Sequence, residues 1–360
     1  LDPAWFYPAA LLICALVSLS IGSSLTTAGT VGLALVGIAQ IMGLSMPATA
    51  GAVISGAYFG DKMSPLSDTT NLSPAMVGAD LFVHIRHMAW TTGPSVLIAL
   101  MIFTFMGLNV EAGQAPAGEI SAARDLLEQN YSIGIPALLP LVLLLALAMR
   151  KVPAFPSISI GALAGCVVAL IWQPDVVRNF ADPDGGLPAW AASVKGLFMA
   201  LADGFSIETG DAGLDELLSR GGMSSMLNTI WLIMSAMCFG GVMERTGLLQ
   251  RIVDALMKGV RGTGSLITTT VLTCIGMNIV AADQYIAIVL PGRMYRLEFE
   301  RRGLAPQNLS RTLEDAGTMT SALVPWNTCG AFMAATLGVP TLAYLPYAFV
   351  NLLNPVISII

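Results

Sequence analysis

Four aspartates stand in apolar segments that are interrupted by glycine, threonine and proline. They are Asp61, Asp68, Asp283 and Asp315. An unpaired carboxylate at the centre of a bilayer is costly, so each must be protonated, paired with a cation or exposed to a water-filled cavity. Burial favours the protonated form and a bound Na+ favours the ionised form, so the two ions compete for one charge. Such competition is the chemistry of cation exchange.

Side-chain oxygens surround these acids and could complete a site for a hard cation such as Na+. Unwound hairpin tips at membrane depth would add backbone carbonyls. The predicted ion site comprises Asp61, Ser67, Asp68, Thr69, Thr70, Asn71, Asp283, Asp315, Asn327 and Thr328. Two other interpretations remain open. The acids could form static ion pairs with Lys62, Arg293 or Arg311, and Asn71 and Asn327 could only cap the hairpin arms.

The composition places these residues in a membrane protein. Of 360 residues, 55% are hydrophobic and 11% are charged, whereas soluble domains carry about 25% charged residues. The mean hydropathy is +0.74. The net charge of -6 and the lack of a basic cluster exclude a nucleic-acid partner. The five cysteines stand alone, which argues against a disulfide framework, a zinc site or haem attachment.

The apolar segments fall into two kinds. Five are long enough to span a bilayer without interruption, because about 20 apolar residues suffice; they are 90–108, 134–149, 157–173, 223–243 and 340–360. Four others are broken by polar residues: 18–37, 48–78, 268–292 and 309–338. A polar loop over 173–223 should hold an interfacial helix at 190–201, and a second is expected at 247–260. The sequence predicts an all-α, multi-pass fold.

The order of the broken segments repeats along the chain. A broken helix and then a two-armed hairpin occur near the start and again near the end, and a shift of 256 positions pairs Asn71 with Asn327. We expect one transmembrane domain, 1–360, with repeats at about 1–108 and 223–360 around scaffold helices at 109–222. Basic residues at both 245–261 and 293–311 leave the topology undetermined.

Two further features complete this picture. The only histidines, His84 and His87, are expected on an interfacial helix as ordinary interface residues, with pH sensing as the alternative. The chain begins with Leu1 and has no signal-peptide pattern, so we expect that N-terminal segments are missing.

Several long motifs resemble those of the NhaC family of sodium/proton antiporters. They are GAYFGDKMSPLSDTTNLSPA with DLFVHIRHM, WLIMSAMCFGGVMERTGLL, ADQYIAIVLPGRMY and RGLAPQNLSRTLEDAGTMTSALVPWNTCGAFMAATLGV. The resemblance covers nearly the whole chain. It implies a member of the ion-transporter superfamily with inverted repeats, two re-entrant hairpins, an elevator-like movement and further N-terminal helices. Family members exchange sodium for protons or couple sodium to malate and lactate.

The function expected is secondary active exchange of cytoplasmic Na+ for external H+ across the inner membrane. The alternative is a Na+/H+-coupled carboxylate exchanger of the same fold, in which Arg293 or Lys62 would bind the anion. A passive channel is a third possibility, and the sequence has no HExxH or nucleophile pattern of an intramembrane hydrolase. The expected partners are Na+, H+, lipid and a second copy in a homodimer, with no cofactor and no enzymatic activity.

Overall fold

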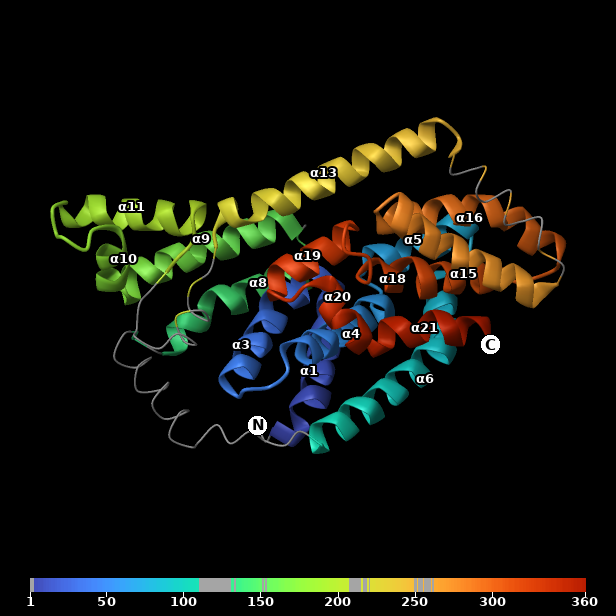
Figure 1. Cartoon of the computed structure of the whole chain (residues 1–360), viewed down its shortest axis with the longest axis horizontal. Coiled ribbons are helices and arrows are strands. Elements are labelled where there is room, and N and C mark those ends of the chain that lie inside the picture. The colour runs from blue at the N-terminus through green and yellow to red at the C-terminus, as the bar shows by residue number, and fades with distance from the viewer. Residues whose placement is uncertain are drawn as a thin grey trace. The chain divides into compact units, whose positions relative to one another are not determined.

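The computed structural model describes residues 3–109, 131–132, 134–150, 152, 154–206, 215, 219, 221–248, 251, 255, 260 and 262–360. All regular elements within these ranges are helices, which confirms the all-α prediction (Figure 1). The chain forms two compact units. Unit 1 comprises Leu1–Val36, Ser45–Glu111 and Thr229–Ile360; unit 2 comprises Gly37–Leu44 and Ala112–Asn228. Most of the interfacial helix expected at 247–260 lies outside the described residues.

The first half of unit 1 contains the first two predicted breaks. After the short η1 (Pro3–Trp5), the helices are α1 (Phe6–Ile21), α2 (Ser24–Thr27), the π-helical η2 (Ala28–Gly32), α3 (Leu33–Ile41, which belongs to unit 2 from Gly37 on), α4 (Met46–Met63), α5 (Asp68–Val77) and α6 (Leu81–Leu108). Gly22 ends α1 with a φ of 75°. A Cβ there would lie 2.6 Å from the Leu66 carbonyl carbon, so only glycine allows this close approach. Helices α4 and α5 form the two arms of the first hairpin.

The second half of unit 1 contains the other two breaks. Its helices are α15 (Thr263–Val280), α16 (Gln284–Arg301), α17 (Pro306–Leu313), the π-helical η4 (Glu314–Thr318), α18 (Met319–Ser321), α19 (Thr328–Leu337), α20 (Thr341–Tyr344), η5 (Leu345–Tyr347) and α21 (Phe349–Ile359). Asp283 begins α16 directly after the break that ends α15. The second hairpin runs from α17 to α19.

Unit 2 is built from the short η3 (Ile135–Leu138) and the helices α8 (Leu139–Met149), α9 (Ala154–Trp172), α10 (Pro174–Ala181) and α11 (Ala189–Ala202). The chain turns sharply after α9, since α9 and α10 are bent by 99° at Gln173. Within its described residues, the expected loop at 173–223 contains the helices α10 and α11. The predicted helix at 190–201 is confirmed as α11, and its position at a membrane interface stays a prediction.

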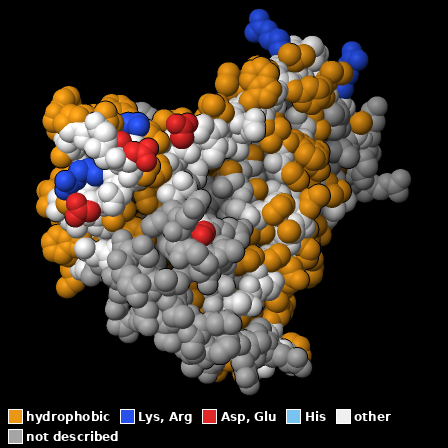
Figure 2. All heavy atoms as spheres, turned by 60° about the vertical axis from the view of Figure 1, so that its left-hand side comes forward, with side chains coloured by type: hydrophobic (Ala, Val, Ile, Leu, Met, Phe, Trp, Pro, Cys, Tyr) orange, Lys and Arg blue, Asp and Glu red, His pale blue; other side chains and the backbone are white. Residues whose placement is uncertain are grey.

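Five described helices are long and apolar enough to cross a membrane, or up to seven if each bent pair counts as one span. They include α13 (Met223–Arg245), of which only a small part is buried. Figure 2 shows hydrophobic side chains over much of one face, with the charged ones in small groups. Such an apolar surface suits lipid contact and confirms a multi-pass membrane protein.

Two predictions about the helices are wrong. Segment 340–360 is not one uninterrupted span, because η5 and Ala348 separate α20 from α21. The histidines do not lie on a separate interfacial helix, since α6 continues unbroken from Leu81 to Leu108. A run of apolar residues does not by itself reveal a break that proline and a non-helical residue introduce.

Several backbone features recur along the chain with a spacing of 260 positions. Positive φ angles occur at Gly22, Gly43 and Gly78 and again at Ala282, Gly303 and Gly338. Side-chain contacts recur as well: Ser18 Oγ donates to the Ala57 carbonyl at 2.6 Å, and Asn278 Nδ2 donates to the Gly317 carbonyl at 2.7 Å. At this spacing, Ser67 rather than Asn71 stands in the position of Asn327, while the repeat itself stays a prediction.

Candidate functional site

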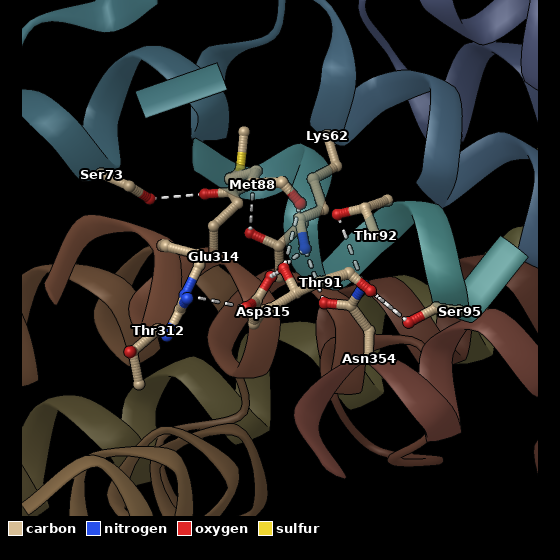
Figure 3. A network of polar contacts seen from close by, with 12 residues as sticks. Lys62, Ser73, Met88, Thr91, Thr92, Ser95, Thr312, Glu314, Asp315 and Asn354 are labelled. Carbon is tan, nitrogen blue, oxygen red and sulfur yellow. Dashed lines mark hydrogen bonds and ion pairs between the residues drawn. The ribbon is translucent and has the colours of Figure 1, made fainter. Parts of the chain in front are cut away.

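A buried ion pair lies where α4, α6, η4 and α21 meet (Figure 3). Lys62 on α4 pairs with Asp315 on η4, and both side chains are fully buried. Lys62 Nζ also donates to Asn354 Oδ1 at 2.6 Å, and Thr91 Oγ1 donates to Asp315 Oδ1 at 3.2 Å. The pair joins the first hairpin to the second. For Asp315, the alternative of an ion pair with Lys62 is thus the one that the structure shows.

Glu314 precedes Asp315 and meets different neighbours. Its carboxylate accepts hydrogen bonds from the Ser73 hydroxyl on α5 and from Thr318 Oγ1, the latter at 2.9 Å. The side chains of Glu314 and Asp315 both lie in the π-helical turn η4, and both are fully buried. Turns of this kind are frequent at functional sites. Among the described residues, no Lys, Arg or His forms an ion pair with Glu314.

Asp61 is a second buried acid without a basic partner among the described residues. It is only 7% exposed. One carboxylate oxygen accepts hydrogen bonds from the Ser24 backbone N–H at 3.1 Å and from Ser24 Oγ at 2.7 Å. The break at Gly22 brings the start of α2 to this carboxylate, and the free N–H groups at a helix start favour a negative charge. The first broken helix and the first hairpin thus meet at Asp61.

The tip of the first hairpin divides the predicted residues into two groups. Ser67 caps α5 by accepting a hydrogen bond from the Thr70 N–H, and Ser67, Thr69 and Thr70 are all buried. Asp68 and Asn71 are exposed instead. Asn71 Nδ2 donates to the carbonyls of Pro65 and Ser67 at 2.9 and 2.7 Å. Of the five predicted residues at this tip, the hydroxyl residues Ser67, Thr69 and Thr70 are buried, and Asp68 and Asn71 are not.

The tip of the second hairpin is a cluster of amides. Asn327 is fully buried and caps α19, since its Oδ1 accepts a hydrogen bond from the Cys329 N–H at 3.0 Å. Its Nδ2 donates to Asn278 Oδ1 at 3.1 Å, and Asn278 Nδ2 donates to Thr320 Oγ1 at 2.9 Å. The neighbouring Thr328 is half-buried. These contacts supply only neutral groups.

Asp283 lies at the break between α15 and α16, as predicted. Its Oδ1 accepts hydrogen bonds from the N–H groups of Tyr285 and Ile286 at 2.9 and 3.0 Å, so it caps α16. The Thr328 N–H donates to the carbonyl of Ala282 at 3.0 Å. The break thus contacts the second hairpin, and the carboxylate that stands there also has a capping role.

His84 and His87 were expected as ordinary residues of an interfacial helix, but their side chains face the protein interior. His84 is fully buried, and its Nδ1 is 2.8 Å from Ser310 Oγ. His87 is partly buried, with Nε2 3.0 Å from Asn308 Oδ1. Both side chains bind α17, since α6 packs against that helix along its first turns.

Sequence reasoning missed four buried polar residues that contact the predicted site residues or Lys62: Ser24, Asn278, Glu314 and Asn354. Glu314 gave a usable signal, because it is an acid inside the same broken segment as Asp315. Asn278 and Ser24 also lie in broken segments. Asn354 gave none, since it stands in the segment 340–360, which was predicted as an uninterrupted span. Across the described residues, no three His, Cys, Asp or Glu side chains form a metal cluster. A bound Na+ would therefore need neutral oxygens as well.

Comparison with known proteins identifies the family. The model of the Na+/H+ antiporter family matches residues 56–360, which include the second hairpin, the first hairpin from residue 56 on, and the buried ion pair. The chain belongs to the Na+/H+ antiporter family. It is 40% identical to the Na+/H+ antiporter NhaC of Alkalihalophilus pseudofirmus over all 360 residues, which is 74% of that protein. The resemblance seen in the motifs is confirmed.

Other members of this family carry different names. The chain is 38% identical to the arginine/ornithine antiporter ArcD of Halobacterium salinarum, over 100% of the chain and 71% of that protein. It is 33% identical to the malate-2H+/Na+-lactate antiporter of Bacillus subtilis, over 98% of the chain and 71% of that protein. All three relatives are transporters. Membership therefore establishes antiport as the class of function, while the choice of ions has to come from the site.

Proposed function

We propose that this chain exchanges Na+ for H+ across the cytoplasmic membrane. The observation that carries this proposal is Asp61, a buried carboxylate whose described partners are all neutral. A buried acid without a cation must hold a proton or a metal ion. The family and the NhaC relative point to Na+ as that ion.

The proposed site uses Asp61 for its charge and nearby hydroxyl oxygens for neutral ligands. Ser24 contacts the carboxylate directly, and Ser67 and Thr70 lie at the adjoining hairpin tip. A single negative charge with neutral oxygens binds Na+ without preventing its release. Asp283, Asn327 and Thr328 remain proposed contributors from the second hairpin. In the proton-bound state, the neutral carboxyl needs no other counter-charge.

Alternating access is the proposed route across the membrane. The recurrence of caps, breaks and contacts at a spacing of 260 supports the proposal that segments 1–108 and 223–360 are two structural repeats. In transporters built from repeats, discontinuous helices form the ion site near the bilayer midplane. The inverted orientation of the repeats that the resemblance implies belongs to this proposal.

The carboxylate exchanger is the second candidate, and the malate/lactate relative favours it. An organic anion needs a cationic partner. Lys62 is the buried cation that could serve, but Asp315 and Asn354 already bind it. Arg293 is exposed. Among these two residues, no buried cation is thus free for a substrate carboxylate, and the proposal keeps the inorganic ions.

Transport in everted vesicles that hold a pH gradient tests the proposal. NaCl should release the accumulated protons, and KCl should do so far less. Asp61→Asn should abolish the release, while Asp80→Asn serves as the control because Asp80 is exposed and Asn also caps helices. A need for malate or lactate before Na+ releases protons would favour the second candidate. Normal exchange in Asp61→Asn would move the site away from Asp61.

A further inference from the structure

Unit 2 contains a pocket that the proposed ion exchange does not use. It lies where α9, α10 and α11 meet, helices that Figure 1 shows together, and its volume is about 240 Å3. Apart from Tyr131 and Gln173, apolar side chains and one glycine line it. An apolar cavity of about 150 Å3 already stays dry and accommodates benzene. This pocket therefore suits a larger apolar group and not an ion.

Small residues on two of the helices create this space. Gly196 on α11 lies so close to α10 that a Cβ there would be 2.5 Å from the Val177 carbonyl oxygen. One helical turn further along α11, the pocket is lined by Ala200, and α9 contributes Ala169. Both side chains have a single carbon, which leaves room beside the ring of Phe180. The pocket thus results from the residues chosen on all three helices.

The helix lengths place the pocket near a membrane surface. With 19 residues, α9 is about 28 Å long, close to the roughly 30 Å of a hydrocarbon core. It ends at the exposed Trp172, a residue type enriched at membrane interfaces, and the chain then bends by 99° into α10. With 14 residues, α11 is about 21 Å long and too short to cross. We therefore expect the pocket at the level of the lipid headgroups.

Apolar side chains on either side of the pocket face outward. They recur at helical spacing on both helices: Leu163, Val167 and Ile171 on α9, and Trp190, Val194 and Phe198 on α11, all of them exposed. In a membrane protein, lipid covers such faces. The apolar groups nearest to the pocket are thus acyl chains of lipids.

Charged side chains at the end of α10 indicate which headgroup accompanies the acyl chain. Lys195 Nζ donates to the Ala181 carbonyl at 2.7 Å, directly after Phe180 of the pocket wall, and among the described residues no acid forms an ion pair with it. Asp182 is the next residue, and its carboxylate accepts a hydrogen bond from the Leu187 N–H at 2.6 Å. One positive and one negative side chain therefore stand at the same helix end. They match a headgroup that has both a phosphate and an ammonium group.

We propose that the pocket of unit 2 binds a zwitterionic phospholipid whose headgroup ends in an ammonium group, as in phosphatidylethanolamine. One acyl chain fills the pocket, the Lys195 ammonium binds the phosphate, and the Asp182 carboxylate binds the ammonium of the headgroup. The bound lipid holds α10 and α11 at the membrane surface. This inference does not depend on the proposed exchange, because none of these residues belongs to the ion site.

Photo-crosslinking of the full chain in detergent tests the site. The probe is phosphatidylethanolamine with a diazirine in one acyl chain, and peptide mapping identifies the labelled residues. Label is expected on Val177, Phe180 and Ala200, which line the pocket. Diacylglycerol, which has no headgroup, should compete at least about tenfold less well than unlabelled phosphatidylethanolamine. Phosphatidylglycerol, which has the phosphate but no ammonium, should also compete less well.

Three results in the wild-type protein would overturn the proposal. Label confined to the outward side chains of α9 and α11 would mean that lipid only surrounds the protein. Equal competition by diacylglycerol would mean that the headgroup is not recognised. Equal competition by phosphatidylglycerol would remove the role of Asp182.

Two pairs of variants test the pocket and the phosphate contact separately. Ala200→Phe fills the pocket and should remove the label from α10, whereas Val194→Phe adds the same ring on the exposed face and should leave it. Lys195→Gln should lower the labelling at limiting probe at least about tenfold, whereas Arg178→Gln removes a charge that Asp175 already pairs at 3.2 Å and should not. Wild-type labelling in Ala200→Phe overturns the pocket as the binding site. Wild-type labelling in Lys195→Gln overturns the phosphate contact.

Discussion

Removing one member of the Lys62–Asp315 pair should strongly destabilise the protein. Both side chains are fully buried, and breaking a buried pair from one side costs about 3–5 kcal/mol because a charge is left without its partner. After Lys62→Met, Asp315 keeps Thr91 and, at 3.7 Å, Arg311 Nε, and Asn354 loses a donor. Since total stabilities are about 5–15 kcal/mol, this single change should remove a large fraction of the free energy of unfolding.

The double variant decides whether the pair is the cause. Adding Asp315→Asn to Lys62→Met removes the uncompensated charge, so it should restore most of the lost stability. A double-mutant cycle of chemical unfolding in detergent gives the coupling energy, which we expect to be at least about 2 kcal/mol. The exposed pair of Arg296 and Glu300, joined at 3.0 Å, is the matched control and should couple by less than about 1 kcal/mol. Simple addition of the two buried single effects would refute the reasoning.

Three further predictions concern the breaks and caps. Ala282 has a φ of 57°, so Ala282→Gly should stabilise the protein by about 1 kcal/mol. The reverse change at the equivalent spacing, Gly22→Ala, should lower the melting temperature sharply. Melting temperatures equal to that of the wild type would contradict both expectations. Asp283→Asn keeps a capping side chain and removes the charge, so exchange in vesicles should vanish while the protein still inserts, and near-normal exchange would leave Asp283 only its capping role. Asn327→Ala should raise the apparent Na+ Km and cost about 1 kcal/mol as a lost cap, while Asn71→Ala at an exposed position should change neither; equal effects would restore Asn71 as a site residue.

The helix breaks could be predicted because their cause is local. Glycine, proline and polar residues within apolar runs mark backbone that a spanning helix avoids, and the breaks at Gly22 and Asp283 fall inside the segments named from the sequence. The break between α20 and α21 was missed for the opposite reason. One proline and one non-helical alanine there are too little to interrupt an apolar pattern.

The site was harder to predict because its partners are distant in the chain. Lys62 and Asp315 lie 253 positions apart, and nothing local distinguishes this pairing from one with Arg293. The spacing between the proposed repeats was hard to predict for a similar reason. An alignment on shared residue types chose Asn71 for Asn327, whereas the corresponding positions share a backbone role, a cap before a ten-residue helix, that Ser67 and Asn327 fill with different side chains.

The backbone features that recur at a spacing of 260 are accompanied by charges that do not recur. At the spacing of 260, Lys62 corresponds to Ala322 and Asp315 corresponds to Ser55. Two copies of either half could therefore not rebuild the buried ion pair by assembling as a symmetric dimer: one combination would lack the acid and the other would lack the base. If the two halves are the repeats proposed above, each half depends on the other for charge balance, and the single chain cannot be divided into two equivalent parts.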